Sequence, residues 1–251
     1  MPLCIVSLGS NLSDRSSAIN TAMESMQRLA GVTDFRASSL YETAPIGGPE
    51  GQDAFLNAAV AFTSEEAPET IFGELLGIEQ TLHRSRRVRW EARTIDLDLL
   101  AYGDSVTKTP TLQVPHPRMS YRPFVLDPAC EVAPDWRHPE LGLDLKSLRR
   151  ILREGDNSIR VVGRYAASLA SLIQAQLTDQ SLAKQDTPQV IWKPHTQDST
   201  PGNKLTIGIE RSVYGTAAGP TLCLEDCPSD DWGSEVRAAI ECVWPGPGRD
   251  S

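Results

Sequence analysis

The stretch Arg93-Thr-Ile-Asp-Leu-Asp98, which continues as Leu-Leu-Ala-Tyr102, places an apolar side chain at every second position. Such alternation is typical of a β-strand that buries one face, so we predict a strand over residues 95–102. Asp96 and Asp98 then share a face, roughly 6–7 Å apart along the backbone. Two adjacent carboxylates suit Mg²⁺, which favours one or two carboxylates completed by phosphates. Taken alone, however, the spacing favours two solvent-facing acids on an amphipathic strand.

Outward from this strand, the N-terminal half alternates between strand and helix patterns. Residues 3–8 and 55–63 are apolar runs typical of buried strands, and residues 33–42 are expected to be extended. A helix should follow the first strand, with Ser13 or Asp14 at its N-cap, and a second should cover residues 67–83. The order βαββαβ predicts an α+β fold, a ferredoxin-like sandwich with helices on an antiparallel sheet.

The C-terminal half has a different character, and we place a domain boundary at residue 155. Residues 103–144 are expected to be irregular because they are rich in proline, and a short helix over residues 145–153 should close the first domain. Residues 156–251 form a smaller C-terminal α/β extension of unknown role. We expect in it a helix over 160–184, a polar segment over 185–203, strands over 204–210 and 220–225, and a helix over 231–243.

Composition restricts the class of protein. The chain has 251 residues and a formal net charge of −9, which argues against nucleic acid or an anionic membrane as a general partner. No apolar run is long enough to span a membrane, and no signal peptide is visible. Five scattered cysteines suit reduced thiols, although Cys223 and Cys227 leave a small chance of a zinc site. We expect a cytoplasmic monomer.

Five arginines precede the paired carboxylates in an otherwise acidic chain: Arg84, Arg86, Arg87, Arg89 and Arg93. Guanidinium groups match phosphate oxygens and stay charged, so this segment suggests phosphates held between arginines and metal. The alternative is a solvated basic loop that binds RNA non-specifically. No P-loop and no dinucleotide-binding glycine pattern occurs, so an ATP-dependent enzyme here needs another architecture.

A second polar cluster surrounds Val114-Pro-His-Pro117, where flanking prolines restrict the backbone around His116. Arg118 and Arg122 follow closely and suggest another phosphate-facing group. Aromatic residues are scarce, yet three flank these clusters and could stack on a flat heterocycle: Phe55, Trp90 and Phe124. Core packing is the alternative for Phe55 and Phe124.

Over residues 3–153 the ordered segments resemble the 6-hydroxymethyl-7,8-dihydropterin pyrophosphokinase family of folate biosynthesis. The segments are Ser7-Leu-Gly-Ser-Asn-Leu12, Ser39-Leu-Tyr-Glu-Thr-Ala-Pro45, Phe55-Leu-Asn-Ala-Ala59, Arg89-Trp through Asp98, and Val114-Pro-His-Pro117. The resemblance implies transfer of diphosphate from MgATP to the pterin alcohol, which gives AMP and the pterin diphosphate. A different ATP-dependent transferase and a non-catalytic binding module that uses the arginine-rich segment are the alternatives.

The resemblance also implies roles for individual residues. Asp96 and Asp98 would bind two Mg²⁺ ions, and they would be catalytic together with Arg84 and Arg93. The pterin would be bound by Thr43, Ala44, Pro45, Ile46, Gly47, Phe55, Asn57, Trp90 and Phe124. ATP would contact Arg86, Leu99, Leu112, His116 and Arg122. The sequence departs from the family at Glu91-Ala92, where Gly-Pro is usual. Because all of these residues precede position 125, we expect a chain that ends near Asn157 to remain active.

Overall fold

The computed structural model describes residues 1–46, 51–82, 93–178, 188–193, 202–214, 217–227 and 231–245. Their contacts divide the chain into two compact units. Unit 1 contains Met1–His116 and Asp127–Asp135, and unit 2 contains Pro117–Leu126 and Trp136–Gly248. Each unit is therefore described by itself. No helix in the described ranges is long and apolar enough to cross a membrane.

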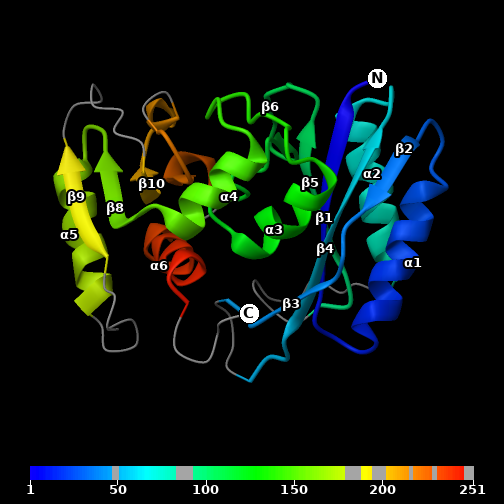
Figure 1. The fold of residues 1–251 in the computed structure, drawn as a ribbon, viewed down its shortest axis with the longest axis horizontal. Coiled ribbons are helices and arrows are strands. Elements are labelled where there is room, and N and C mark those ends of the chain that lie inside the picture. The colour runs from blue at the N-terminus through cyan, green and yellow to red at the C-terminus, as the bar shows by residue number, and fades with distance from the viewer. Residues whose placement is uncertain are drawn as a thin grey trace. The chain divides into compact units, whose positions relative to one another are not determined.

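Unit 1 is built on an antiparallel sheet with strand order β2-β4-β1-β5, in which β3 also pairs with β4 (Figure 1). The strands are β1 (Leu3–Ser10), β2 (Thr33–Ala37), β3 (Tyr41–Thr43), β4 (Phe55–Thr63) and β5 (Asp96–Tyr102). Helices α1 (Arg15–Gln27) and α2 (Pro68–Thr81) contact each other and cover one face of the sheet. The expected strands and helices of this half are confirmed to within a few residues.

Local chemistry explains these elements. The side chain of Asp14 caps α1 by accepting a hydrogen bond from the Ser17 N–H at 3.0 Å, and Pro68 begins α2, where its missing N–H costs nothing. Along β1, Val6 and Leu8 point into the core beneath the two helices. Ser7 and Gly9, which alternate with them along the strand, therefore face the side of the sheet opposite α1 and α2.

Residues 103–144 contain more regular structure than expected. A short hairpin is formed by β6 (Thr107–Lys108) and β7 (Gln113–Val114), and α3 spans Pro123–Val132. The expectation of an irregular segment was wrong for α3, because the prolines of this segment argue against a helix when only the sequence is considered. Pro123 lies at the helix start, where proline is tolerated, and Pro128 is accommodated inside the helix.

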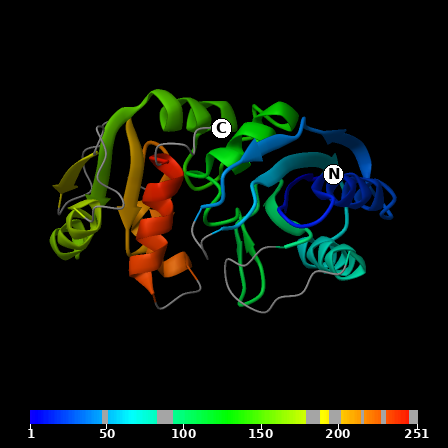
Figure 2. The same ribbon diagram turned by 90° about the horizontal axis from the view of Figure 1, so that it is seen from below.

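Unit 2 is a parallel α/β structure with strand order β11-β10-β8-β9. Its strands are β8 (Asp156–Val162), β9 (Gln189–Lys193), β10 (Asn203–Gly208) and β11 (Thr221–Cys223). Its helices are α4 (Leu145–Glu154), α5 (Ala166–Thr178) and α6 (Trp232–Val243), with 3₁₀ turns η1 (Arg211–Val213) and η2 (Leu224–Asp226). Helix α4 packs against β10, and α5 packs against α6, β8 and β9, as Figure 2 helps to follow.

Three expectations for this half need correction. Residues 160–162, expected to begin a helix, end strand β8, because Val161 and Val162 are buried β-branched residues of a parallel sheet. Strand β9 lies within residues 185–203, which were expected only to be a polar segment, since pairing with β8 offsets its weak local pattern. Helix α4, expected to close the first domain, makes its contacts in unit 2.

Candidate active site

The face of the unit 1 sheet opposite α1 and α2 carries both carboxylates of β5. Asp96 lies opposite Gly9 on β1, and Asp98 lies opposite Ser7. Both side chains are partly exposed, while Leu97 between them is buried in the helix-side core. The predicted same-face arrangement of the two acids is therefore present, on the side of the sheet opposite α1 and α2.

Asn57 reaches the same face from the other neighbour of β1. It lies opposite Gly9, is 4% exposed, and donates a hydrogen bond from Nδ2 to Thr43 Oγ1 on β3 at 2.8 Å. A β-carbon at Gly9 would lie 3.3 Å from Asn57 Oδ1 and 3.9 Å from the Phe55 ring. Glycine at this position therefore leaves room for the amide and the ring beside it.

Arg93 is fixed at the entrance to β5 by its backbone and by its side chain. Its N–H donates to Asn11 Oδ1 at 2.8 Å, and its carbonyl accepts from the Asn11 N–H at 3.1 Å. Its guanidinium forms an ion pair with Asp96. This pair offsets part of the negative charge on β5, and it leaves a cation next to the carboxylates.

Glu79 is a buried acid that the sequence reasoning missed. It lies on α2, is 2% exposed, and its Oε1 accepts a hydrogen bond from the Leu97 N–H at 2.8 Å. Because β5 is the edge strand, this N–H has no strand partner on that side. Glu79 thus holds the backbone between the two aspartates. The sequence signal that could have identified Glu79 is its position one turn after Leu75, on the apolar stripe of α2.

Three of the residues expected to contact ATP lie at different places in unit 1. The His116 N–H donates to the Leu100 carbonyl at 2.9 Å, which attaches the Val-Pro-His-Pro segment to β5. Leu99 and Leu112 have buried side chains, 3% and 4% exposed, within the helix-side core of unit 1. Their expected role beside adenine remains a prediction.

The remaining expected residues lie in unit 2 or at the limits of the described ranges. In unit 2, the Arg122 guanidinium lies 5.5 Å from the Phe124 ring centroid, within cation–π range. Thr43, Ala44, Pro45 and Ile46 are half-buried. Gly47, Arg84, Arg86 and Trp90 fall outside the described residues.

The donor set on β5 fits Mg²⁺. In the described ranges, no group of three or more histidine, cysteine or acidic side chains could hold a metal ion. Asp96 and Asp98 instead offer two hard oxygen donors on one partly exposed face, the small carboxylate set that Mg²⁺ takes when phosphates supply further ligands. Cys223 and Cys227 are buried thiols, and Cys227 Sγ donates to the Cys223 carbonyl at 3.5 Å.

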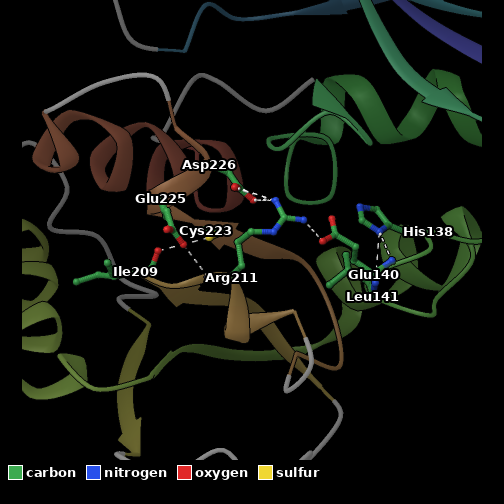
Figure 3. A network of polar contacts seen from close by, with 8 residues as sticks. All are labelled: His138, Glu140, Leu141, Ile209, Arg211, Cys223, Glu225 and Asp226. Atoms are coloured by element: carbon green, nitrogen blue, oxygen red, sulfur yellow. Dashed lines mark hydrogen bonds and ion pairs between the residues drawn. The ribbon is translucent and has the colours of Figure 1, made fainter. Parts of the chain in front are cut away.

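A separate polar network stabilises the end of the unit 2 sheet (Figure 3). Arg211 makes two hydrogen bonds to Asp226, at 2.8 and 2.9 Å, and an ion pair with Glu140. The nearby His138 Nδ1 accepts from the N–H groups of Glu140 and Leu141, both at 3.3 Å. Burial lowers the pKa of His138 to about 4. The network therefore has the character of a stabilising interaction, because one guanidinium, that of Arg211, binds the carboxylates of both Asp226 and Glu140.

Comparison with known proteins links these features to one family. The family model described as 7,8-dihydro-6-hydroxymethylpterin-pyrophosphokinase matches residues 5–134. The chain is similar to proteins named 2-amino-4-hydroxy-6-hydroxymethyldihydropteridine pyrophosphokinase. The relative from a Synechocystis strain is 36% identical over 152 residues, covering 61% of this chain and 75% of the relative. The relative from Bacillus subtilis is 41% identical over 130 residues, covering 52% and 77%.

Solved structures are similar at lower identity. A crystal structure of wild-type Plasmodium falciparum HPPK-DHPS with pteroate matches with a TM-score of 0.45 at 12% identity. The match covers 80% of this chain and 56% of that one, so the chain spans about half the length of this structural relative.

Proposed function

The chain belongs to the 7,8-dihydro-6-hydroxymethylpterin-pyrophosphokinase family, and from that premise we propose how its residues transfer diphosphate from ATP to the pterin alcohol in folate biosynthesis. The observation that carries the proposal is a row of residues across three strands. Asn57 on β4 and Asp96 on β5 lie opposite the same residue, Gly9. An amide that can recognise a heterocycle and a carboxylate suited to magnesium therefore share one face of the sheet.

The architecture we propose for the catalytic part of the chain, residues 1–155, is a ferredoxin-like sandwich whose strands and two helices lie between Leu3 and Tyr102. The strand order β2-β4-β1-β5, with all pairs antiparallel and two helices on one face, supports it. Residues 156–251 are the proposed C-terminal extension, in which the described strands form a parallel sheet.

Asp96 and Asp98 are the proposed metal ligands, for two Mg²⁺ ions. Bound there, the ions would neutralise charge on the ATP phosphates and polarise the reacting oxygens. Arg93 supports this assignment because it is already paired with Asp96. When phosphates enter, the guanidinium can shift from the carboxylate to a phosphate oxygen, since its fork suits either acceptor.

The remaining ATP contacts are proposed from the family pattern and supported by local chemistry. Arg84, Arg86, His116 and Arg122 would face the phosphates, and Leu99 and Leu112 would border the adenine. The hydrogen bond between the His116 N–H and Leu100 joins this segment to the same strand as the carboxylates, which supports a common site.

The pterin would be recognised by the Asn57 amide and by the backbone of residues 43–47, with Phe55, Phe124 and Trp90 contacting the ring. Asn57 Nδ2 is held by Thr43, so the orientation of its amide is set before substrate binds. A preorganised polar group in a buried position gives specificity, because a ring that cannot match it leaves it unpaired.

In the reaction, the pterin hydroxymethyl oxygen forms a bond to the β-phosphorus of ATP. The bond between that phosphorus and the α,β-bridging oxygen breaks, and AMP leaves with the electron pair. The hydroxyl proton passes to Asp98 or to water. The residues contribute mainly by positioning the two substrates and by matching developing charge.

The test is AMP formation that requires both Mg²⁺ and the pterin alcohol. AMP without pterin would indicate another ATP-dependent transferase, and RNA binding without turnover would favour the non-catalytic module. Cytoplasmic location, a monomeric state and the absence of nucleic acid or membrane partners stay predictions. The five free cysteines suit a reducing compartment.

A further inference from the structure

The segment Pro117–Leu126, which carries Arg122 and Phe124, is bonded to the C-terminal extension. Arg118 makes two hydrogen bonds to Glu235 on α6: Nε to Oε2 at 3.0 Å and Nη2 to Oε1 at 2.9 Å. The two side chains are 13% and 1% exposed. A bidentate pair of this kind fixes the orientation of the guanidinium as well as its distance. Removing one partner leaves the other charge buried without compensation.

A second attachment lies two residues further along. Ser120 Oγ donates to the Thr221 carbonyl at 3.0 Å and accepts from the Thr221 N–H at 2.9 Å. Both residues are buried, 3% and 0% exposed. The hydroxyl of Ser120 therefore extends the edge of β11 as a backbone group would. The next residue, Tyr121, is 2% exposed, and burial raises the pKa of its phenol.

These attachments precede the residues that the proposed function places at the phosphates and the pterin. The Arg122 carbonyl accepts hydrogen bonds from the N–H groups of Val125 and Leu126 and so begins α3. Between His116 and α3 the backbone forms turns and pairs with no strand. Side-chain contacts therefore help to set its conformation, and two of them connect it to residues more than 100 positions away, Thr221 and Glu235.

We propose that the C-terminal extension is a brace for the ATP site, in which Glu235 and Thr221 hold Arg118 and Ser120 so that Arg122 and Phe124 are correctly placed. Glu235 and Ser120 are positioning residues, because they act through Arg122 and touch no substrate. This inference rests on the proposed function, which assigns Arg122 to the ATP phosphates.

The test compares full-length Glu235→Gln with a matched control, Asp226→Asn. The control weakens another carboxylate–arginine pair of unit 2, that of Asp226 with Arg211 (Figure 3). For Glu235→Gln we expect KM for ATP to rise about tenfold, with a smaller change in kcat, since misplacement of a binding group weakens ground-state contacts. The control should stay within about twofold of wild type in both constants at a temperature where all proteins are folded.

Hydrogen exchange gives a readout that does not depend on turnover. Amides of residues 117–126 should exchange faster in Glu235→Gln than in wild type, and at the wild-type rate in Asp226→Asn. Ser120→Ala removes the hydroxyl that forms hydrogen bonds to the Thr221 backbone, and it should reproduce both effects. It replaces Glu235→Gln as the test variant if Glu235→Gln does not fold.

The brace is refuted if both variants keep the wild-type KM for ATP, or if Asp226→Asn raises it equally. The proposed function fails separately, when wild type forms no pterin-dependent AMP. Faster exchange in the two variants without a change in KM would show that the extension holds the segment but that the segment does not serve ATP.

Discussion

Asn57 and Asp96 lie opposite the same glycine, Gly9, on the two strands that flank β1. Adjacent strands are about 4.8 Å apart, so the two backbones are separated by about 10 Å on one face of the sheet. A pterin ring recognised at Asn57 would extend its hydroxymethyl group toward the carboxylates across Gly9. The lack of a side chain at residue 9 thus connects the two halves of the proposed site.

Enlarging residue 9 tests this relationship. In Gly9→Ala the new methyl would lie 3.3 Å from Asn57 Oδ1, so the amide must shift. We expect KM for the pterin to rise about tenfold while KM for ATP changes little. Gly73→Ala is the control, because nothing lies within 4 Å of the added carbon on α2. It should keep both constants and raise stability by up to ~1 kcal/mol. Equal pterin KM values in the two variants would contradict the prediction.

Replacing the carboxylates proposed to bind metal tests the Mg²⁺ assignment. We expect Asp96→Asn or Asp98→Asn to lower kcat by about a hundredfold or more, because charge on the phosphates is no longer neutralised. The melting temperature should change little, since the partly exposed Arg93–Asp96 pair contributes at most ~1 kcal/mol. Asp104→Asn, in an exposed turn after β5, is the control and should be fully active. A double Asn variant with near-normal turnover would exclude the assignment.

Glu79 should matter for the stability of β5. In Glu79→Ala the Leu97 N–H loses its acceptor in a buried position, at a cost of roughly 1–3 kcal/mol. In Glu79→Gln the amide oxygen can still accept that hydrogen bond, so a smaller loss is expected. Urea unfolding followed by circular dichroism measures both. Equal losses in the two variants would show that the charge, and not the hydrogen bond to Leu97, is what matters.

His138 predicts a pH dependence of folding. Its pKa is lowered to about 4 by burial, against 6.5 unfolded, so the unfolded chain binds the additional proton between these values. The neutral imidazole therefore contributes full stability above pH 6.5, and about 3 kcal/mol is lost as the pH falls toward 4. Unfolding free energies of wild type and His138→Asn at pH 7 and pH 5 test this. The difference between the two proteins should shrink at pH 5, because only wild type has this proton to bind.

Truncation gives the most direct contrast with the expectation from sequence. A chain that ends at Asn157 lacks both Thr221 and Glu235, so Arg118 would lose its buried partner. We now expect such a chain to lose ATP affinity by more than tenfold or to aggregate. Soluble truncated protein with the wild-type KM for ATP would instead support the expectation from sequence that the extension is dispensable.

The sequence by itself determined the local features of this protein. Alternation along residues 95–102 predicted that Asp96 and Asp98 share a face, and capping chemistry placed the start of α1 at Ser13 or Asp14, of which Asp14 is the cap. These signals depend on side chains a few residues apart, whose geometry is set by the helix or strand itself. Proline was the least reliable signal, because its effect depends on its position in the helix, and α3 was therefore missed.

Tertiary structure decided which distant residues meet. Glu79 and Leu97 are 18 positions apart, Asn57 and Asp96 are 39 apart, and Arg118 and Glu235 are 117 apart. No local period relates such pairs, since their contact depends on strand order and on the packing of helices against the sheet. The same reason explains β9, whose weak local pattern is offset by pairing with β8. The shared face of the two carboxylates could thus be predicted from the sequence, whereas the groups that hold this strand and its neighbours in place required the fold.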